Sequence, residues 1–209
     1  MKSLIAAVLL WLAVSVCQAD IIIEVESRSL PYSSTGLVDI YASSSNDNVQ
    51  SFGLKLEISG GSVDGSLTFV LPQTYDSQSH PDYIFFGNTD PSGWASNVGV
   101  GSRTLTLGDF TFDGTDYNLT SRKLLARVQV QHTTADPGQT VGDVYTISVV
   151  DDGSTLFVDS NSIPVNFTSS SGNLTVTTPE PSTVGLLAVC GVGLFWRLRR
   201  SGHSRHVAK

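Results

Sequence analysis

The sequence predicts an all-β protein: a single antiparallel β-sandwich flanked by an N-terminal signal helix and a C-terminal transmembrane helix. Between residues 20 and 178, apolar and polar residues alternate along many short segments. Clusters of Gly, Asp, Asn and Ser separate these segments, and none of them keeps a helical spacing over three turns. Alternation gives each strand one apolar and one polar face, which is typical of antiparallel sheets packed face to face.

Three segments carry the alternation most clearly. In residues 52–58 every second residue is apolar, whereas Lys55 and Glu57 point the other way. Residues 124–130 and 145–149 repeat this pattern. We expect further strands at residues 21–26, 37–42, 67–71, 83–86, 104–112, 155–158, 164–167 and 174–177.

The first nineteen residues resemble a secretory signal peptide. Lys2 supplies a positive start, residues 4–16 form a short apolar run, and small residues precede Asp20. We therefore expect residues 1–19 to be cleaved and the protein to be exported. A second interpretation is a lipoprotein signal with Cys17 lipidated, although the preceding Val16 is bulkier than the glycine or alanine that such sites use.

The segment 20–178 is the predicted ectodomain, and it is strongly acidic. It holds 18 acidic and six basic residues, hence a net charge of −12. Such a body repels phosphate backbones, so nucleic acid is excluded as a partner. Both cysteines, Cys17 and Cys190, lie in the hydrophobic end segments, which leaves the ectodomain without disulfides or cysteine metal ligands.

The C-terminal segment 179–209 begins with Pro179-Glu180-Pro181 and continues with an uncharged stretch, residues 182–196. As a helix this stretch is about 22 Å long, against a hydrocarbon core of about 30 Å. Trp196 at the interface and a snorkelling Arg197 extend its reach. The alternative interpretation is a C-terminal helix buried in the sandwich.

A membrane stop follows the uncharged stretch, formed by Arg197, Arg199 and Arg200. Because positive charge stays in the cytoplasm, this order places the ectodomain outside the membrane. Tripeptide, apolar helix and arginines together resemble the PEP-CTERM sorting signal of Gram-negative bacteria. That resemblance implies that exosortase, a membrane-embedded protease, recognises Pro179, Glu180 and Pro181 and removes the tail. The protein would be held briefly in the membrane and then reach the cell surface or an extracellular matrix.

The ectodomain offers little for catalysis. Its two histidines, His80 and His132, are both predicted in solvated loops, and no G-x-S-x-G, H-E-x-x-H or P-loop motif occurs. We therefore expect no enzyme activity and no required cofactor, with an unrecognised hydrolase as the third-ranked function.

Calcium is the one metal that the sequence suggests. Asp113, Asp116, Asp151 and Asp152 cluster oxygen donors near strand ends, as Ca²⁺ sites require. Ordinary Asp-Gly turns explain the same residues through side-chain hydrogen bonds to the backbone, so both interpretations stand.

A sugar-binding surface is the last candidate site. Tyr83 and Trp94 flank a polar, glycine-containing stretch and are candidate platforms for stacking on sugar rings, although Trp94 could instead cap the core. The strands at 36–41, 51–58, 124–130 and 142–149 resemble those of cohesins and carbohydrate-binding modules, β-sandwiches of cohesin-like or jelly-roll-like form. The resemblance implies partner capture through a flat sheet face. We therefore predict a structural or adhesive protein that binds another surface protein, with carbohydrate binding to exopolysaccharide as the alternative.

Overall fold

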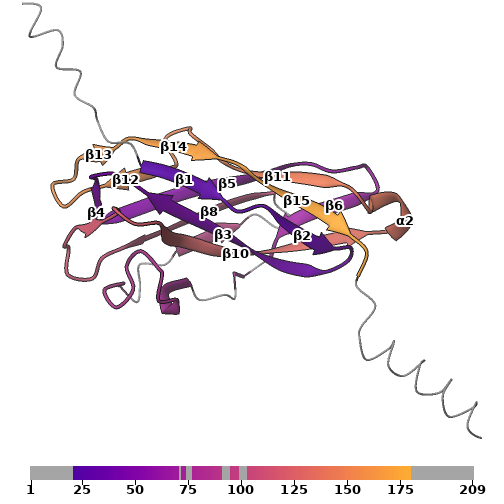
Figure 1. The fold of residues 1–209 in the computed structure, drawn as a ribbon, viewed down its shortest axis with the longest axis horizontal. Helices are drawn as coiled ribbons and strands as arrows, with labels where there is room; N and C mark the ends of the chain where they lie inside the picture. The colour runs from indigo at the N-terminus through magenta and orange to yellow at the C-terminus, as the bar shows by residue number, and fades with distance from the viewer. Residues whose placement is uncertain (1–20, 71, 74–76, 91–94, 99–102, 180–209) are drawn as a thin grey trace, which may run out of the picture. The chain divides into compact units, whose positions relative to one another are not determined.

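The structure, a computed structural model, describes residues 21–70, 72–73, 77–90, 95–98 and 103–179, with the backbone alone for 95–98. Two β-sheets pack against each other, as Figure 1 shows. Within these residues, no helix has the length and apolar character needed to cross a membrane. The predicted signal peptide, 1–19, and the predicted transmembrane helix, 182–196, lie outside the described residues.

The first sheet has five strands in the order β14-β1-β3-β10-β6. Their bounds are β1 Ile21–Val25, β3 Thr35–Ser43, β6 Gly65–Phe69, β10 Lys123–Thr134 and β14 Phe167–Ser170. Strands β3 and β10 form its centre, with a bulge in β10 between Leu124 and Ala126.

The second sheet follows the order β13-β12-β5-β11-β15-β2, with β8 also paired to β5 and β7 paired to β8. Its bounds are β2 Arg28–Pro31, β5 Ser51–Gly60, β7 Ala95–Val98, β8 Thr104–Phe110, β11 Val144–Val149, β12 Leu156–Val158, β13 Pro164–Val165 and β15 Gly172–Thr177. The remaining elements are short: β4 Asn48–Val49, β9 Tyr117–Asn118, η1 Ser77–Ser79 and α2 Pro137–Thr140.

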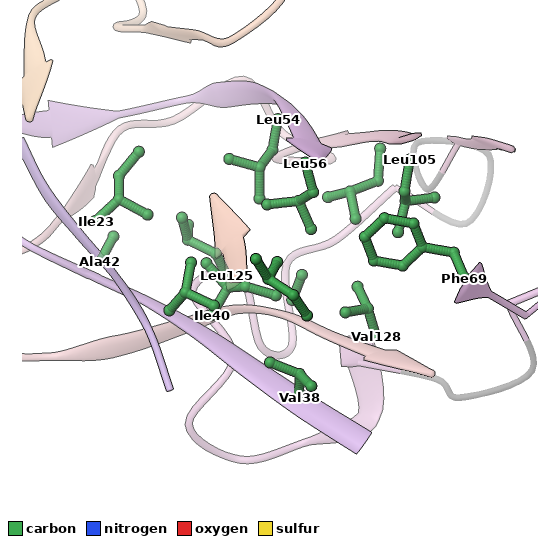
Figure 2. Packing of buried hydrophobic residues seen from close by; sticks show 14 of the residues in the cluster. Ile23, Val38, Ile40, Ala42, Leu54, Leu56, Phe69, Leu105, Leu125 and Val128 are labelled. Carbon is green, nitrogen blue, oxygen red and sulfur yellow. The ribbon is translucent and has the colours of Figure 1, made fainter. Parts of the chain in front are cut away.

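The core lies between the two sheets and follows the predicted alternation. On β5 the inward side chains of Phe52, Leu54, Leu56 and Ile58 are buried, and the residues between them face outward. Figure 2 shows Leu54 and Leu56 of the second sheet facing Ile40 and Val38 of the first. Because each such side chain contributes about 1.5–3 kcal/mol on burial, this layer is the main source of stability.

Two pairings depart from the expectation of a purely antiparallel sandwich. The chain passes from β1 in the first sheet to β2 in the second, and later from β14 to β15 in the same way. The two segments run parallel to each other in both sheets. At the crossing, a Cβ on Gly172 would lie 2.6 Å from the Glu26 carbonyl oxygen, so only glycine allows this approach.

The predicted strand at 83–86 is wrong. Tyr83, Ile84 and Phe85 are consecutive and all fully buried, which a strand with alternating faces does not allow. Successive turns form instead, because the Tyr83 N–H donates to the His80 carbonyl and the Phe86 N–H donates to the Tyr83 carbonyl. The segment inserts its aromatic rings into the core, where Phe85 packs 5.9 Å from Phe52 between ring centroids.

Candidate functional site

The start of the predicted sorting signal adjoins the last strand directly. Strand β15 ends at Thr177, whose carbonyl accepts the N–H of Tyr32 at 3.0 Å. Pro179 is exposed two residues later. Glu180, Pro181 and the arginines Arg197, Arg199 and Arg200 lie outside the described residues. The sandwich therefore reaches to within one residue, Thr178, of the tripeptide.

Two of the predicted calcium ligands, Asp113 and Asp116, bind different parts of the protein. Asp113 accepts hydrogen bonds from the Asn88 amide at 2.8 Å and the Thr115 hydroxyl at 2.7 Å. These bonds lower the pKa of its carboxyl to about 2. Asp116 instead accepts the Ser160 N–H at 2.7 Å and its hydroxyl at 2.8 Å, which ties this turn to the β12–β13 hairpin.

The other two predicted ligands, Asp151 and Asp152, also differ from each other. Asp152 forms an ion pair with Lys55 at 2.5 Å and accepts the Ser154 N–H, which lowers its pKa to about 2. Asp151 lines a surface pocket. Across the described ranges, no group of three or more His, Cys, Asp or Glu side chains is placed to hold a metal ion. Calcium binding at these residues stays a prediction.

The structure corrects the sugar platform proposed at Tyr83. Its ring is fully buried and its hydroxyl donates to Asp109 at 2.6 Å, so it presents no face to a sugar. Trp94 lies outside the described residues. Among the described aromatic residues, Phe112, Phe86 and Phe110 are exposed instead, at 69%, 47% and 40%.

Asp109 is a buried carboxylate that the sequence did not single out. Besides Tyr83, it accepts the Gln78 amide at 2.9 Å, the Thr89 hydroxyl at 2.8 Å and the N–H of Phe110. It therefore fastens the irregular segment 77–90 to the second sheet. A buried carboxylate that accepts this many hydrogen bonds from its own domain serves structure.

The prediction of a solvated loop for His132 is wrong. Strand β10 continues to Thr134, and His132 lies on its inward face, fully buried. Its Nδ1 accepts the Ser33 N–H at 3.2 Å. Burial lowers the pKa of His132, partly offset by the charge of Asp143. Its Nε2 and the Tyr145 hydroxyl are both buried without a hydrogen-bond partner in the described part of the chain.

The outer face of the first sheet carries an ion network around Asp39, whose side chain is fully buried. Asp39 lies directly opposite Arg127 in the register of β3 and β10, and both carboxylate oxygens pair with that guanidinium. Arg28 and the Tyr41 hydroxyl complete the site at 3.2 and 3.3 Å. Burial raises the Asp39 pKa, but the Arg127 hydrogen bond and the two arginine charges outweigh it, so the pKa lies below its ordinary value.

The network extends further, to Arg122 on this face. The Arg122 guanidinium lies 3.4 Å from the centroid of the Tyr41 ring and also pairs with Glu24. Because its cations and anions already pair with one another, this face is a structural network and a weak candidate for ligand binding.

The outer face of the second sheet is different, because small and apolar residues meet there. Gly53 and Gly108 are direct partners in the β5–β8 register, and Gly53 also lies opposite Leu156 of β12. Ser51 of β5 lies opposite Phe110 of β8 on one side and opposite Val158 of β12 on the other. We call these six residues the glycine face.

The glycine face combines a flat centre with exposed apolar side chains. Neither glycine carries a side chain above the sheet, whereas Leu156 and Phe110 flank them at 43% and 40% exposure. Farther along β5 and β8 the outward residues Lys55, Thr104 and Thr106 are polar. An apolar patch with a polar surround is the surface composition of protein interfaces.

Comparison with known proteins gives one family match and a fold. The family model of the PEP-CTERM protein-sorting motif matches residues 177–200, so the chain carries this motif at the predicted place. The motif indicates an exported protein with a membrane-anchored intermediate. No curated protein matches the chain.

The solved structures that are similar to the chain include several cohesins. The seventh type I cohesin of ScaB from Pseudobacteroides cellulosolvens has a TM-score of 0.55 at 9% identity, covering 78% of this chain and 96% of its own. A chain from a cohesin–dockerin complex of Clostridium thermocellum has a TM-score of 0.53 at 13% identity. The match covers 77% of this chain and 95% of the other. A non-cellulosomal cohesin from Archaeoglobus fulgidus has a TM-score of 0.51 at 14% identity. The match covers 78% of this chain and 94% of the other. At these identities the likeness shows the fold alone: the described domain is a cohesin-like β-sandwich.

Proposed function

We propose that this chain is an exported protein whose sandwich binds another protein at the cell surface or in the extracellular matrix, without catalysis. An exosortase-type membrane protease would first recognise Pro179-Glu180-Pro181 and remove the tail. The sorting motif supports this route of export. The cohesin-like fold supports a structural or adhesive role, since a cohesin of this fold occurs in complex with a dockerin.

The glycine face is the observation that carries the binding proposal. Neither glycine raises a side chain above the sheet, although the Ser154 carbonyl lies beside Gly53, and the flanking Phe110 and Leu156 offer apolar surface to bury. A specific interface needs about 800 Å² from each partner, which requires the polar surround of the face as well as its centre. The flat sheet then sets the orientation, while the apolar pair supplies most of the affinity.

Carbohydrate binding is the second candidate, and the exposed ring of Phe112 favours it. An aromatic ring with 69% exposure just after the end of β8 can stack on a sugar face. The two candidates predict different chemistry in the matrix partner, namely a protein surface in one case and a glycan in the other.

One binding assay separates these functions. Labelled full chain in detergent micelles is added to extracellular matrix from the producing cells, and the bound fraction is measured. Phe110→Ser with Leu156→Ser should weaken binding about tenfold or more, whereas Val63→Ser, which removes a fully exposed apolar residue elsewhere, should leave it unchanged.

Treatment of the matrix identifies the partner. Prior proteolysis should abolish binding, and periodate oxidation of sugars should not. Loss of binding after periodate alone, together with sensitivity to Phe112→Ala, would transfer the function to carbohydrate. Equal binding by the double variant and the wild-type chain would remove the glycine face from the interface.

A further inference from the structure

The pocket beside Asp151 adjoins the glycine face. It is lined by Asp151, Thr155 and Leu156, from the loop after β11 and the start of β12, and by Pro164, Val165 and Phe167 on the other side. Its volume of about 360 Å³ falls within the range of about 300–1,000 Å³ for ligand pockets. Leu156 belongs to both the pocket and the glycine face, so the two surfaces are continuous.

The walls of the pocket are held in place by hydrogen bonds. The Thr155 hydroxyl donates to the Val150 carbonyl at 2.7 Å and accepts the Lys55 N–H at 3.1 Å, which fixes the loop against β5. On the other wall, the Asn166 carbonyl accepts the N–H of Ile21 at 3.0 Å. A pocket with a fixed frame binds without first ordering a loop, which lowers the entropic cost of association.

The lining of the pocket is mixed and combines apolar side chains, the polar residues Thr155 and Asn166, and one negative charge. Leu156, Pro164, Val165 and Phe167 offer hydrocarbon surface, and Asp151 adds a carboxylate. The neighbouring Asp152 takes the ammonium of Lys55, so that lysine does not neutralise Asp151. Apolar side chains beside a carboxylate match a side chain with a hydrocarbon stem and a cationic head.

The charge of the ectodomain favours such a partner. With a net charge of −12 for residues 20–178, the domain attracts basic surfaces over long range. Arginine is also enriched among the residues that anchor protein interfaces in pockets, because its planar fork pairs with a carboxylate in a fixed geometry.

We propose that this pocket receives an arginine side chain of the protein that docks on the glycine face. The arginine stem packs on Leu156, Pro164 and Phe167, and its guanidinium pairs with Asp151. This assignment rests on the proposed function, and it makes the partner a protein with a basic residue at the edge of an apolar docking surface.

A peptide titration tests the pocket without knowledge of the partner. The full chain in detergent micelles, labelled with ¹⁵N, is titrated with acetyl-Gly-Arg-Gly-amide and with the same peptide carrying neutral citrulline. We expect the arginine peptide to shift the amide signals of Thr155, Leu156 and Val165, and the citrulline peptide to shift them at least fivefold less. Asp151→Asn should abolish this difference, whereas Asp64→Asn, with the same change of charge at another exposed acid, should keep it. Equal shifts from both peptides, or equal effects of both substitutions, would overturn the assignment.

The matrix-binding assay separates failure of this inference from failure of the proposed function. If Asp151→Asn binds the matrix like the wild-type chain while the Phe110→Ser, Leu156→Ser variant does not, the pocket assignment is wrong and the glycine face stands. If neither variant loses binding, the proposed docking surface itself is wrong. If both lose binding and only the arginine peptide shifts the pocket signals, both proposals hold.

Discussion

The ion network at Asp39 gives the sharpest prediction for stability. Asp39→Ala removes a carboxylate that accepts two hydrogen bonds from the Arg127 guanidinium, a side chain that is only 17% exposed. Breaking a buried pair from one side costs about 3–5 kcal/mol. Because Arg28 keeps its bond to Glu26 at 2.9 Å, we expect the lower end, about 3 kcal/mol. At about 2–4 °C per kcal/mol, the melting temperature should fall by roughly 6–12 °C.

The matched control removes both charges at once. Asp39 and Arg127 lie opposite each other, so Asp39→Leu combined with Arg127→Met exchanges the pair for apolar residues across the same two strands. This double variant should stay within about 1 kcal/mol of the wild-type chain, since apolar replacement of a buried pair is often neutral. Urea unfolding followed by circular dichroism measures all three chains. A cost below about 1 kcal/mol for Asp39→Ala, or a double variant as unstable as the single one, would refute the reasoning.

Two further predictions concern pH and processing. Burial lowers the pKa of His132 in the folded state. As the pH falls below about 6.5, this histidine is protonated in the unfolded chain before it is protonated in the folded one, so the free energy of unfolding decreases until the pH reaches the folded-state pKa. His132→Phe, which cannot titrate, should lose less of its urea midpoint between pH 7.5 and 5.5 than the wild-type chain, and parallel slopes would contradict this account. The intact mass of the protein isolated from its cell envelope should show that the wild-type chain ends near Thr178 and that the Glu180→Ala variant keeps its tail. Equal processing of both chains would contradict recognition of the tripeptide.

The strands were predictable where alternation was long and undisturbed. Residues 52–58 and 145–149 lie in β5 and β11, since a period of two follows directly from one buried and one exposed face. Strand β2 was missed because only Leu30 of its four residues is buried and it ends in Pro31, which an edge strand accepts. His132 was misplaced because β10 continues past the expected end at residue 130.

The candidate sites depended on contacts between residues far apart in sequence, which periodicity does not reveal. Asp116 meets Ser160, and Asp152 meets Lys55, only because the sheets bring distant turns together. The glycine face required the register of β5 with β8 and β12. The sorting motif was predictable because the tripeptide, the uncharged stretch and the arginines follow one another directly in the sequence.

The position of β15 determines how the sandwich carries mechanical load. A chain held through its C-terminal end feels tension along β15, which lies between β11 and β2 and is hydrogen-bonded to both. Such a pull shears two ladders simultaneously and cannot unzip one bond after another. Resistance to force is set by the rate of unfolding, so the double-sided strand suits the proposed adhesive role, in which the sandwich has to stay folded under tension.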